Sequence, residues 1–228
     1  MTIEEMHVMF RELAQQMGMQ TVRAILPENI DICINIAIDN KVKSLIISNI
    51  GVLPYNDKVA RQNAAISSIN GLRTLYRKSS IVASKITGKG TEVSPFVGSI
   101  SSDEVMLYLG FKVSYDDKTL YDCRIIEHEN LSRTIKDYSN RATKTAPVCI
   151  VYGDSTNRWL EIINGTNEPI KPTMIQYLYL ANPKTVKYDE ANTANNVDCD
   201  LPSYLHTKIV QEAVDVYITS IGANKNNN

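Results

Sequence analysis

The sequence predicts an α+β protein in which N-terminal helices and a C-terminal helix pack together, with an antiparallel β-sandwich or small barrel inserted between them. Two observations support this fold class. Apolar residues recur at helical spacing near both ends of the chain, whereas they alternate with a period of two in its middle. Helices and strands also do not alternate along the sequence, so a parallel nucleotide-binding sheet is not expected.

Two helices are predicted in the first fifty residues. Thr2 is followed three residues later by Glu5, which is the pattern of a capping box, and the apolar spacing then continues until Gly18. A second helix is expected from Pro27, a residue suited to a first helical turn, to Ile50. Its apolar residues exceed a single stripe, so we expect it to be buried on more than one side.

The next segment gives weaker signals. An apolar stripe that ends at Tyr76 predicts a third helix, which would begin near Asn56 or Asp57. From Arg77 to Asp103 the chain is rich in Ser, Gly, Thr and Lys, which indicates an extended connection with one short strand near residues 81–83.

Strict alternation of apolar and polar residues begins at Glu104 and predicts a strand that runs to Tyr115. Polar turns separate it from four further predicted strands at 120–127, 148–152, 158–163 and 174–181. A last helix is expected to open at Pro202 and to end at Gly222. The predicted organisation is a helical region with its extended connection (1–103), an antiparallel β domain (104–200), a C-terminal helix that returns to the helical region (201–222) and a disordered tail (223–228).

Composition excludes several classes of function. The 24 Lys and Arg are balanced by 25 Asp and Glu, and this near-neutrality disfavours a protein whose main task is to coat nucleic acid. Apolar runs are too short for a bilayer span, and Met1 opens onto Glu4 and Glu5, so neither a membrane segment nor an export signal is expected. The four cysteines and three histidines lack metal-binding spacing, and we expect no metal, no cofactor and buried cysteines.

Two short motifs are candidate sites of chemistry. Residues 88–91 (Gly-Lys-Gly-Thr) are similar to part of a phosphate loop, but the first glycine of that motif is missing, which favours a mobile loop. His128 lies between Glu127 and Glu129 and is a candidate proton donor, but no nucleophile is tied to it by a recognisable motif. A hydrolase centred on His128 is therefore the weakest hypothesis.

Two further sets of residues are candidates for contacts with partners. The first set is apolar, comes from the second and the last helix and is a candidate interface with a partner: Ile30, Ile34, Ile38, Ile209 and Ala213. The second set is a basic cluster between two strands: Arg133, Lys136, Arg141 and Lys144. The ordinary interpretation of such a cluster is a solvated surface. The alternative is a positive lining that faces DNA without reading its sequence, since phosphate contacts need only charge.

Three phrases of the sequence carry a resemblance to a known group of proteins. Residues 26–31 (Leu-Pro-Glu-Asn-Ile-Asp) resemble the acidic helix opening of structural proteins from short-tailed phages. The tyrosine-rich segment 176–183, which ends in proline, is similar to a strand of those proteins, and residues 201–206 resemble the start of their closing helix. Together the phrases point to the head-to-tail adaptor, or ring, proteins of tailed phages, including the crAss-like group.

This resemblance implies a virion protein of the neck or tail, made in the host cytoplasm. Adaptors assemble as rings, commonly of twelve copies, below the portal and around the DNA exit channel, and they catalyse nothing. The implied partners are other copies of the chain, the portal protein, other neck or tail ring proteins and passing DNA in non-specific contact. The resemblance thus makes the apolar set a candidate subunit or portal interface. The main alternative is a phage cargo protein or another intracellular binding protein.

Overall fold

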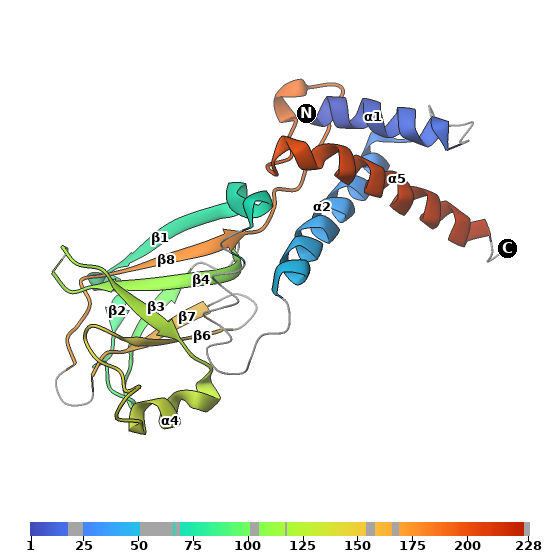
Figure 1. The fold of residues 1–228 in the computed structure, drawn as a ribbon. Helices are drawn as coiled ribbons and strands as arrows, with labels where there is room; N and C mark the ends of the chain where they lie inside the picture. Colours follow the sequence, from blue (N-terminus) through green and yellow to red (C-terminus); the bar gives the residue numbers. More distant parts are fainter. Residues whose placement is uncertain are drawn as a thin grey trace. The chain divides into compact units, whose positions relative to one another are not determined.

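The computed structural model describes residues 1–17, 25–50, 66, 69–100, 105–116, 118–153, 158–165 and 169–225. The chain divides into two compact units (Figure 1). The helical unit comprises residues 1–51, 69–75 and 183–228, and the β unit comprises residues 52–68 and 76–182. Helices from both ends of the chain and a sheet formed by its middle confirm the predicted α+β class.

The helical unit is built from α1 (Ile3–Gln16), α2 (Pro27–Ile50) and α5 (Ser203–Lys225), with short 3₁₀ segments η2 (Asn70–Leu75) and η5 (Thr193–Asn195). α5 packs against both α1 and α2, which confirms that the last helix returns to the N-terminal ones. The rings of Phe10 and Tyr217 meet edge to face with centroids 5.8 Å apart. α5 continues beyond Gly222 to Lys225, so the expected end at that glycine is wrong. Residues 226–228, in the predicted tail, lie outside the described residues.

α1 begins where the sequence predicts. The Thr2 hydroxyl accepts a hydrogen bond from the Glu5 amide at 3.2 Å, and the Glu5 carboxylate accepts one from the Thr2 amide at 2.9 Å. This reciprocal pair satisfies two of the amides that a helix start leaves without partners. The Ile3 amide donates to Asp198 at 2.7 Å, which ties the start of the chain to the segment before α5.

A buried hydrogen-bond network around Asp31 joins α1, α2 and the segment that precedes α5. The Asp31 carboxylate lies 2.8 Å from His7 Nε2 and accepts the Tyr188 amide at 3.0 Å. One turn along α2, the Asn35 side chain accepts the Val186 amide at 2.8 Å and donates to the Val186 carbonyl at 3.0 Å. His7 and Asp31 are both buried, so this polar network fixes three separate segments in one register.

α2 is buried on one side, and the expectation of burial on several sides is wrong for the chain by itself. Ile30, Ile34 and Ile38 are at most 2% exposed, because α5 packs along their side of the helix. Ile32, Ile36 and Ile47 are 57%, 41% and 72% exposed. The apolar residues of this helix therefore form one covered stripe and one uncovered stripe.

The described residues of the β unit form eight strands, β1 (Tyr76–Val82), β2 (Ile86–Thr87), β3 (Phe96–Ile100), β4 (Val105–Ser114), β5 (Tyr121–Ile125), β6 (Val148–Gly153), β7 (Arg158–Ile163) and β8 (Met174–Ala181). They form one sheet in the order β1-β8-β4-β5-β6-β7-β3-β2. All neighbouring strands are antiparallel except β5 and β6, which are parallel. The five strands expected after residue 104 are confirmed, with ends that differ by at most two residues.

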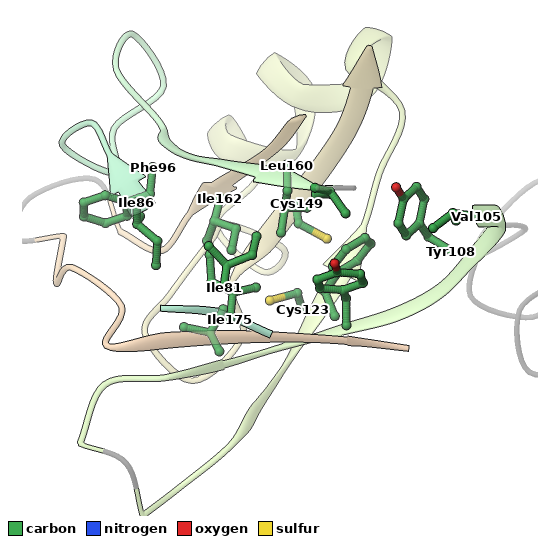
Figure 2. Close-up of a cluster of buried hydrophobic side chains, with 14 residues drawn as sticks. Ile81, Ile86, Phe96, Val105, Tyr108, Cys123, Cys149, Leu160, Ile162 and Ile175 are labelled. Atoms are coloured by element: carbon green, nitrogen blue, oxygen red, sulfur yellow. The ribbon is translucent and has the colours of Figure 1, made fainter. Parts of the chain in front are cut away.

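The sheet curves until it is nearly closed around its core. Ile81 of β1 lies over Gly98 of β3, where a Cβ would come within 2.9 Å of the isoleucine Cδ1. Figure 2 shows the aliphatic and aromatic side chains that fill the interior, with the thiols of Cys123 and Cys149 among them. All four cysteines are free and buried, as expected, and burial raises the pKa of the Cys149 thiol well above its ordinary value.

The β unit is larger than the sequence indicates. In place of a connection with one short strand, the segment 77–103 contains most of β1, together with β2, β3 and the 3₁₀ turn η3 (Ala83–Lys85). Tyr76 opens β1 and so does not end a helix; the body of the predicted third helix lies mainly outside the described residues. Strand pairing in the β unit therefore begins at residue 76, and the unit ends at residue 182. The expected bounds of 104 and 200 are wrong.

Replacement of Ile34 by Asp should unfold the helical unit, because it buries a charge where the isoleucine is fully covered. Deletion of a buried isoleucine alone costs about 2–5 kcal/mol, so we expect the variant to be destabilised by about 4 kcal/mol or more in urea denaturation followed by circular dichroism. Ile32→Asp, on the exposed side of the same helix, is the matched control and should change stability by less than about 1 kcal/mol. Equal destabilisation of the two variants would contradict the one-sided burial of α2.

Candidate nucleic-acid interface

The predicted basic cluster lies on the crossover between the parallel strands β5 and β6. Parallel neighbours cannot be joined by a tight turn, and here the connection contains the 3₁₀ turn η4 (His128–Asn130) and the short helix α4 (Leu131–Lys136) (Figure 1). Leu131 and Ile135, one turn apart, pack onto Ala142, Val148 and Ile163. The apolar side of α4 is thus directed to the sheet.

All four basic residues of the cluster are exposed. Arg133 and Lys136 come from α4, three residues apart, and Arg141 and Lys144 come from the loop that leads into β6. The Arg141 guanidinium lies 4.9 Å from the ring centre of Tyr138, which is 82% exposed. A guanidinium stacked on an exposed ring is kept in place while its donors stay accessible to an anion.

The loop that carries Arg141 is fixed by its own hydrogen bonds. The Arg124 guanidinium of β5 donates to the carbonyls of Asn140 and Arg141. The Asp137 carboxylate accepts the Asn140 side-chain amide at 2.7 Å and the Ser139 amide at 2.9 Å. These bonds, with a further contribution from the charge of Arg133, hold the pKa of Asp137 below its usual range.

Lys144 is placed beside Tyr115, at the end of the neighbouring hairpin. Its ammonium lies 5.6 Å from the centre of the tyrosine ring. The Tyr115 hydroxyl accepts a hydrogen bond from the Asn164 side chain at 3.0 Å, and burial raises the pKa of this tyrosine to about 12. The Tyr115 ring is therefore held in place and is uncharged at physiological pH, with the lysine ammonium beside it.

The arrangement offers positive charge on an ordered but open surface. It presents phosphate-binding groups without the helix in a groove that is needed to read base edges. The hollow on the outer side of α1 is unsuited to an anion, because three glutamates line it together with Val8 and Met9. The basic crossover is thus the better candidate for contact with nucleic acid.

The other candidate sites fare differently. In the 88–91 loop, the amides of Lys89 and Thr91 both donate to the Ser94 carbonyl, so they are not available to cradle a phosphate. Gly88 and Gly90 have φ values of 98° and 80°, which glycine adopts without strain in the 88–95 loop between β2 and β3. His128 is exposed, and its ring makes no hydrogen bond within the described part of the chain. No group of three potential metal ligands occurs among the described residues.

The candidate interface residues are already covered within the chain. Ile30, Ile34, Ile38, Ile209 and Ala213 are all buried where α2 and α5 pack together. A side chain covered by its own chain offers no surface to a partner, so an interface on α2 would have to use the exposed isoleucines of the opposite stripe. Those isoleucines are apparent in the sequence, but no sequence pattern assigns them a partner.

Sequence reasoning also missed α4, Tyr138 and Arg124, which together position the basic cluster. The spacing of Leu131 and Ile135 is a helical signal, but it is too short to distinguish a single turn from a loop. The long-range hydrogen bonds of Arg124 have no counterpart in a sequence pattern.

Comparison with protein-family models and with curated proteins finds no match for the chain. Among the described helices, none is both long enough and apolar enough to cross a membrane.

The high pKa of Tyr115 makes stability depend on pH in the alkaline range. Its folded pKa is about 12, against an ordinary value of 10.0, so its contribution is complete below pH 10 and is lost as the pH rises from 10 to 12. Absorbance titration should show one fewer tyrosine ionising near pH 12 in Tyr115→Phe than in the unchanged chain. A Tyr115 that titrates near pH 10 would contradict its burial.

Proposed function

We propose that the protein is a virion structural protein, a ring-forming head-to-tail adaptor subunit that joins the portal to the tail and surrounds the DNA exit channel. The observation that supports this function best is the basic crossover in a chain of net charge −1. A channel wall needs local positive charge that tolerates phosphate, whereas a strongly positive wall would retain the duplex. Exposed Arg133, Lys136, Arg141 and Lys144 on the ordered crossover between β5 and β6 meet that requirement.

The resemblance to adaptors of short-tailed phages supports the same function. Its three phrases fall at the start of α2, along β8 and at the start of α5. The partners proposed on this basis are other copies of the chain in a ring, commonly of twelve, the portal protein and other ring proteins of the neck or tail. The protein would act without catalysis and would lie in the virion neck.

The alternative function is that of a phage cargo or other intracellular binding protein. Both functions suit a chain with no recognised site of catalysis, and oligomeric state separates them. A hydrolase is less favoured, because His128 has no described residue that would orient its ring.

Native mass spectrometry of the purified chain, alone and with the portal protein, tests the ring. We expect an assembly many times the 25.5 kDa mass of the chain, because a closed ring needs many copies. The portal serves as a template in the second sample, so a ring that forms only on the portal would also support the proposal. A chain that stays small in both samples would favour cargo.

Replacement of all four basic residues of the cluster by Gln should weaken binding to duplex DNA. The unchanged chain should bind weakly, with a dissociation constant of about 10⁻⁴ to 10⁻⁶ M, and without sequence preference. Each basic side chain that neutralises a phosphate should account for about 0.9 of the slope of log K against log salt, so the variant should have a shallower slope in fluorescence anisotropy across salt concentrations. The matched control replaces four exposed lysines elsewhere, Lys85, Lys184, Lys187 and Lys208, and should bind as the unchanged chain does. Equally weakened binding in both variants would remove the basic crossover as the DNA-facing surface.

A further inference from the structure

The basic crossover carries a tyrosine whose ring lies in solvent. Tyr138 is 82% exposed, more than any other aromatic side chain among the described residues. Tyr204 and Tyr152 follow at 63% and 44%, and Tyr152 is stacked on Trp159 with ring centroids 5.6 Å apart. An aromatic side chain is usually covered over most of its surface, so a ring this open is a candidate for contact with a ligand.

The backbone around Tyr138 is held by hydrogen bonds, so the exposure of the ring does not come from a lack of order. The Asn140 amide donates to the Asp137 carbonyl at 3.2 Å, which closes a turn around Tyr138. The Asp137 carboxylate accepts the Ser139 amide at 2.9 Å within the same turn. Ala142, two residues after the turn, is 2% exposed and anchors the segment to the sheet. The tyrosine is therefore presented outward from a fixed turn.

Cations surround this open ring. The Arg141 guanidinium lies 4.9 Å from the ring centre, yet Tyr138 remains 82% exposed, so most of the ring stays accessible. Arg133 and Lys136, on the helix that precedes the turn, are exposed as well, and residues 138–147 include no acidic side chain. An aromatic ring next to basic side chains is the arrangement with which proteins bind single strands, because a base stacks on the ring while the cations bind the phosphates.

We infer that the basic crossover binds unpaired DNA nucleotides, with a base stacked on Tyr138 and phosphates bound by the basic residues around it. Bases inside a duplex are covered on both faces by their neighbours, so a duplex offers this ring only its phosphates and the edges of its bases. An unpaired base offers a whole face, and every base has one, so no sequence preference is expected. The inference rests on the proposed function, which makes this surface the one that faces DNA, and it adds the stacking contact.

Binding of oligonucleotides to the unchanged chain tests the stacking. Fluorescence anisotropy should be measured with a labelled thymidine oligomer, with an abasic oligomer of the same length and with a duplex of the same length. The abasic oligomer retains the sugar–phosphate backbone, so it reports the contribution of charge alone. We expect the thymidine oligomer to bind about 5- to 150-fold more tightly than the abasic one, which is the range for one stacked base.

Variants at the ring separate stacking from charge. Tyr138→Ala should reduce binding of the thymidine oligomer to that of the abasic one, without a change in the slope of log K against log salt, because the ring carries no charge. Tyr138→Phe keeps the ring and should bind as the unchanged chain does. Arg141→Gln should instead lower the slope by about 0.7, the value for one phosphate of a single strand. Tyr204→Ala, at an exposed tyrosine of α5, is the matched control and should bind normally.

The outcomes distinguish the stacking contact from the proposed function. Equal binding of the thymidine and abasic oligomers, or a Tyr138→Ala variant that still binds the thymidine oligomer more tightly than the abasic one, would overturn the inference. If duplex binding then still depends on the four basic residues, the proposed function is unaffected. Loss of the advantage of the thymidine oligomer in Tyr138→Ala, with duplex binding unchanged, would support the inference. Circular dichroism of every variant reports whether the fold is retained.

Discussion

The helical unit depends on one buried carboxylate. Asp31 binds His7 of α1 and the amide of Tyr188, and Asn35 on the next turn of α2 binds both polar groups of the Val186 backbone. A buried carboxylate is unfavourable unless such partners surround it, so the network forms only when all three segments are in place. It thereby ties the two ends of the chain into one helical unit although the whole β unit lies between them in sequence.

In the β unit, strand pairing joins segments that are far apart in the sequence. Its first and last strands, β1 and β8, are neighbours in the sheet, so the segment 76–182 begins and ends along one antiparallel pair. Within the sheet, the parallel pairing of β5 and β6 requires a long crossover, because a tight turn cannot join parallel strands. That topological requirement creates the exposed segment on which the basic residues lie.

The two units expose surfaces of different chemical character. The β unit exposes the ordered basic crossover between β5 and β6, and the helical unit exposes the uncovered isoleucines of α2, Ile32, Ile36 and Ile47. The basic residues can be picked out in the sequence, but which isoleucines of α2 are exposed is seen only in the folded chain.

The sequence by itself determined the fold class, the capping box at Thr2, the bounds of α2 and the five strands from β4 to β8, because each depends on local periodicity or on local turn chemistry. It also located the basic cluster. The sequence predicted a short strand near 81–83, but the tertiary structure alone decided that strands occupy much of 76–100, since Arg77 to Ser80 become a strand by pairing with residues 176–179, about a hundred positions later. It alone decided which isoleucines of α2 are covered, because a helix with apolar residues on two sides does not specify which side α5 will occupy. Pairing between distant segments leaves no period in the sequence, and that is why these features required the folded chain.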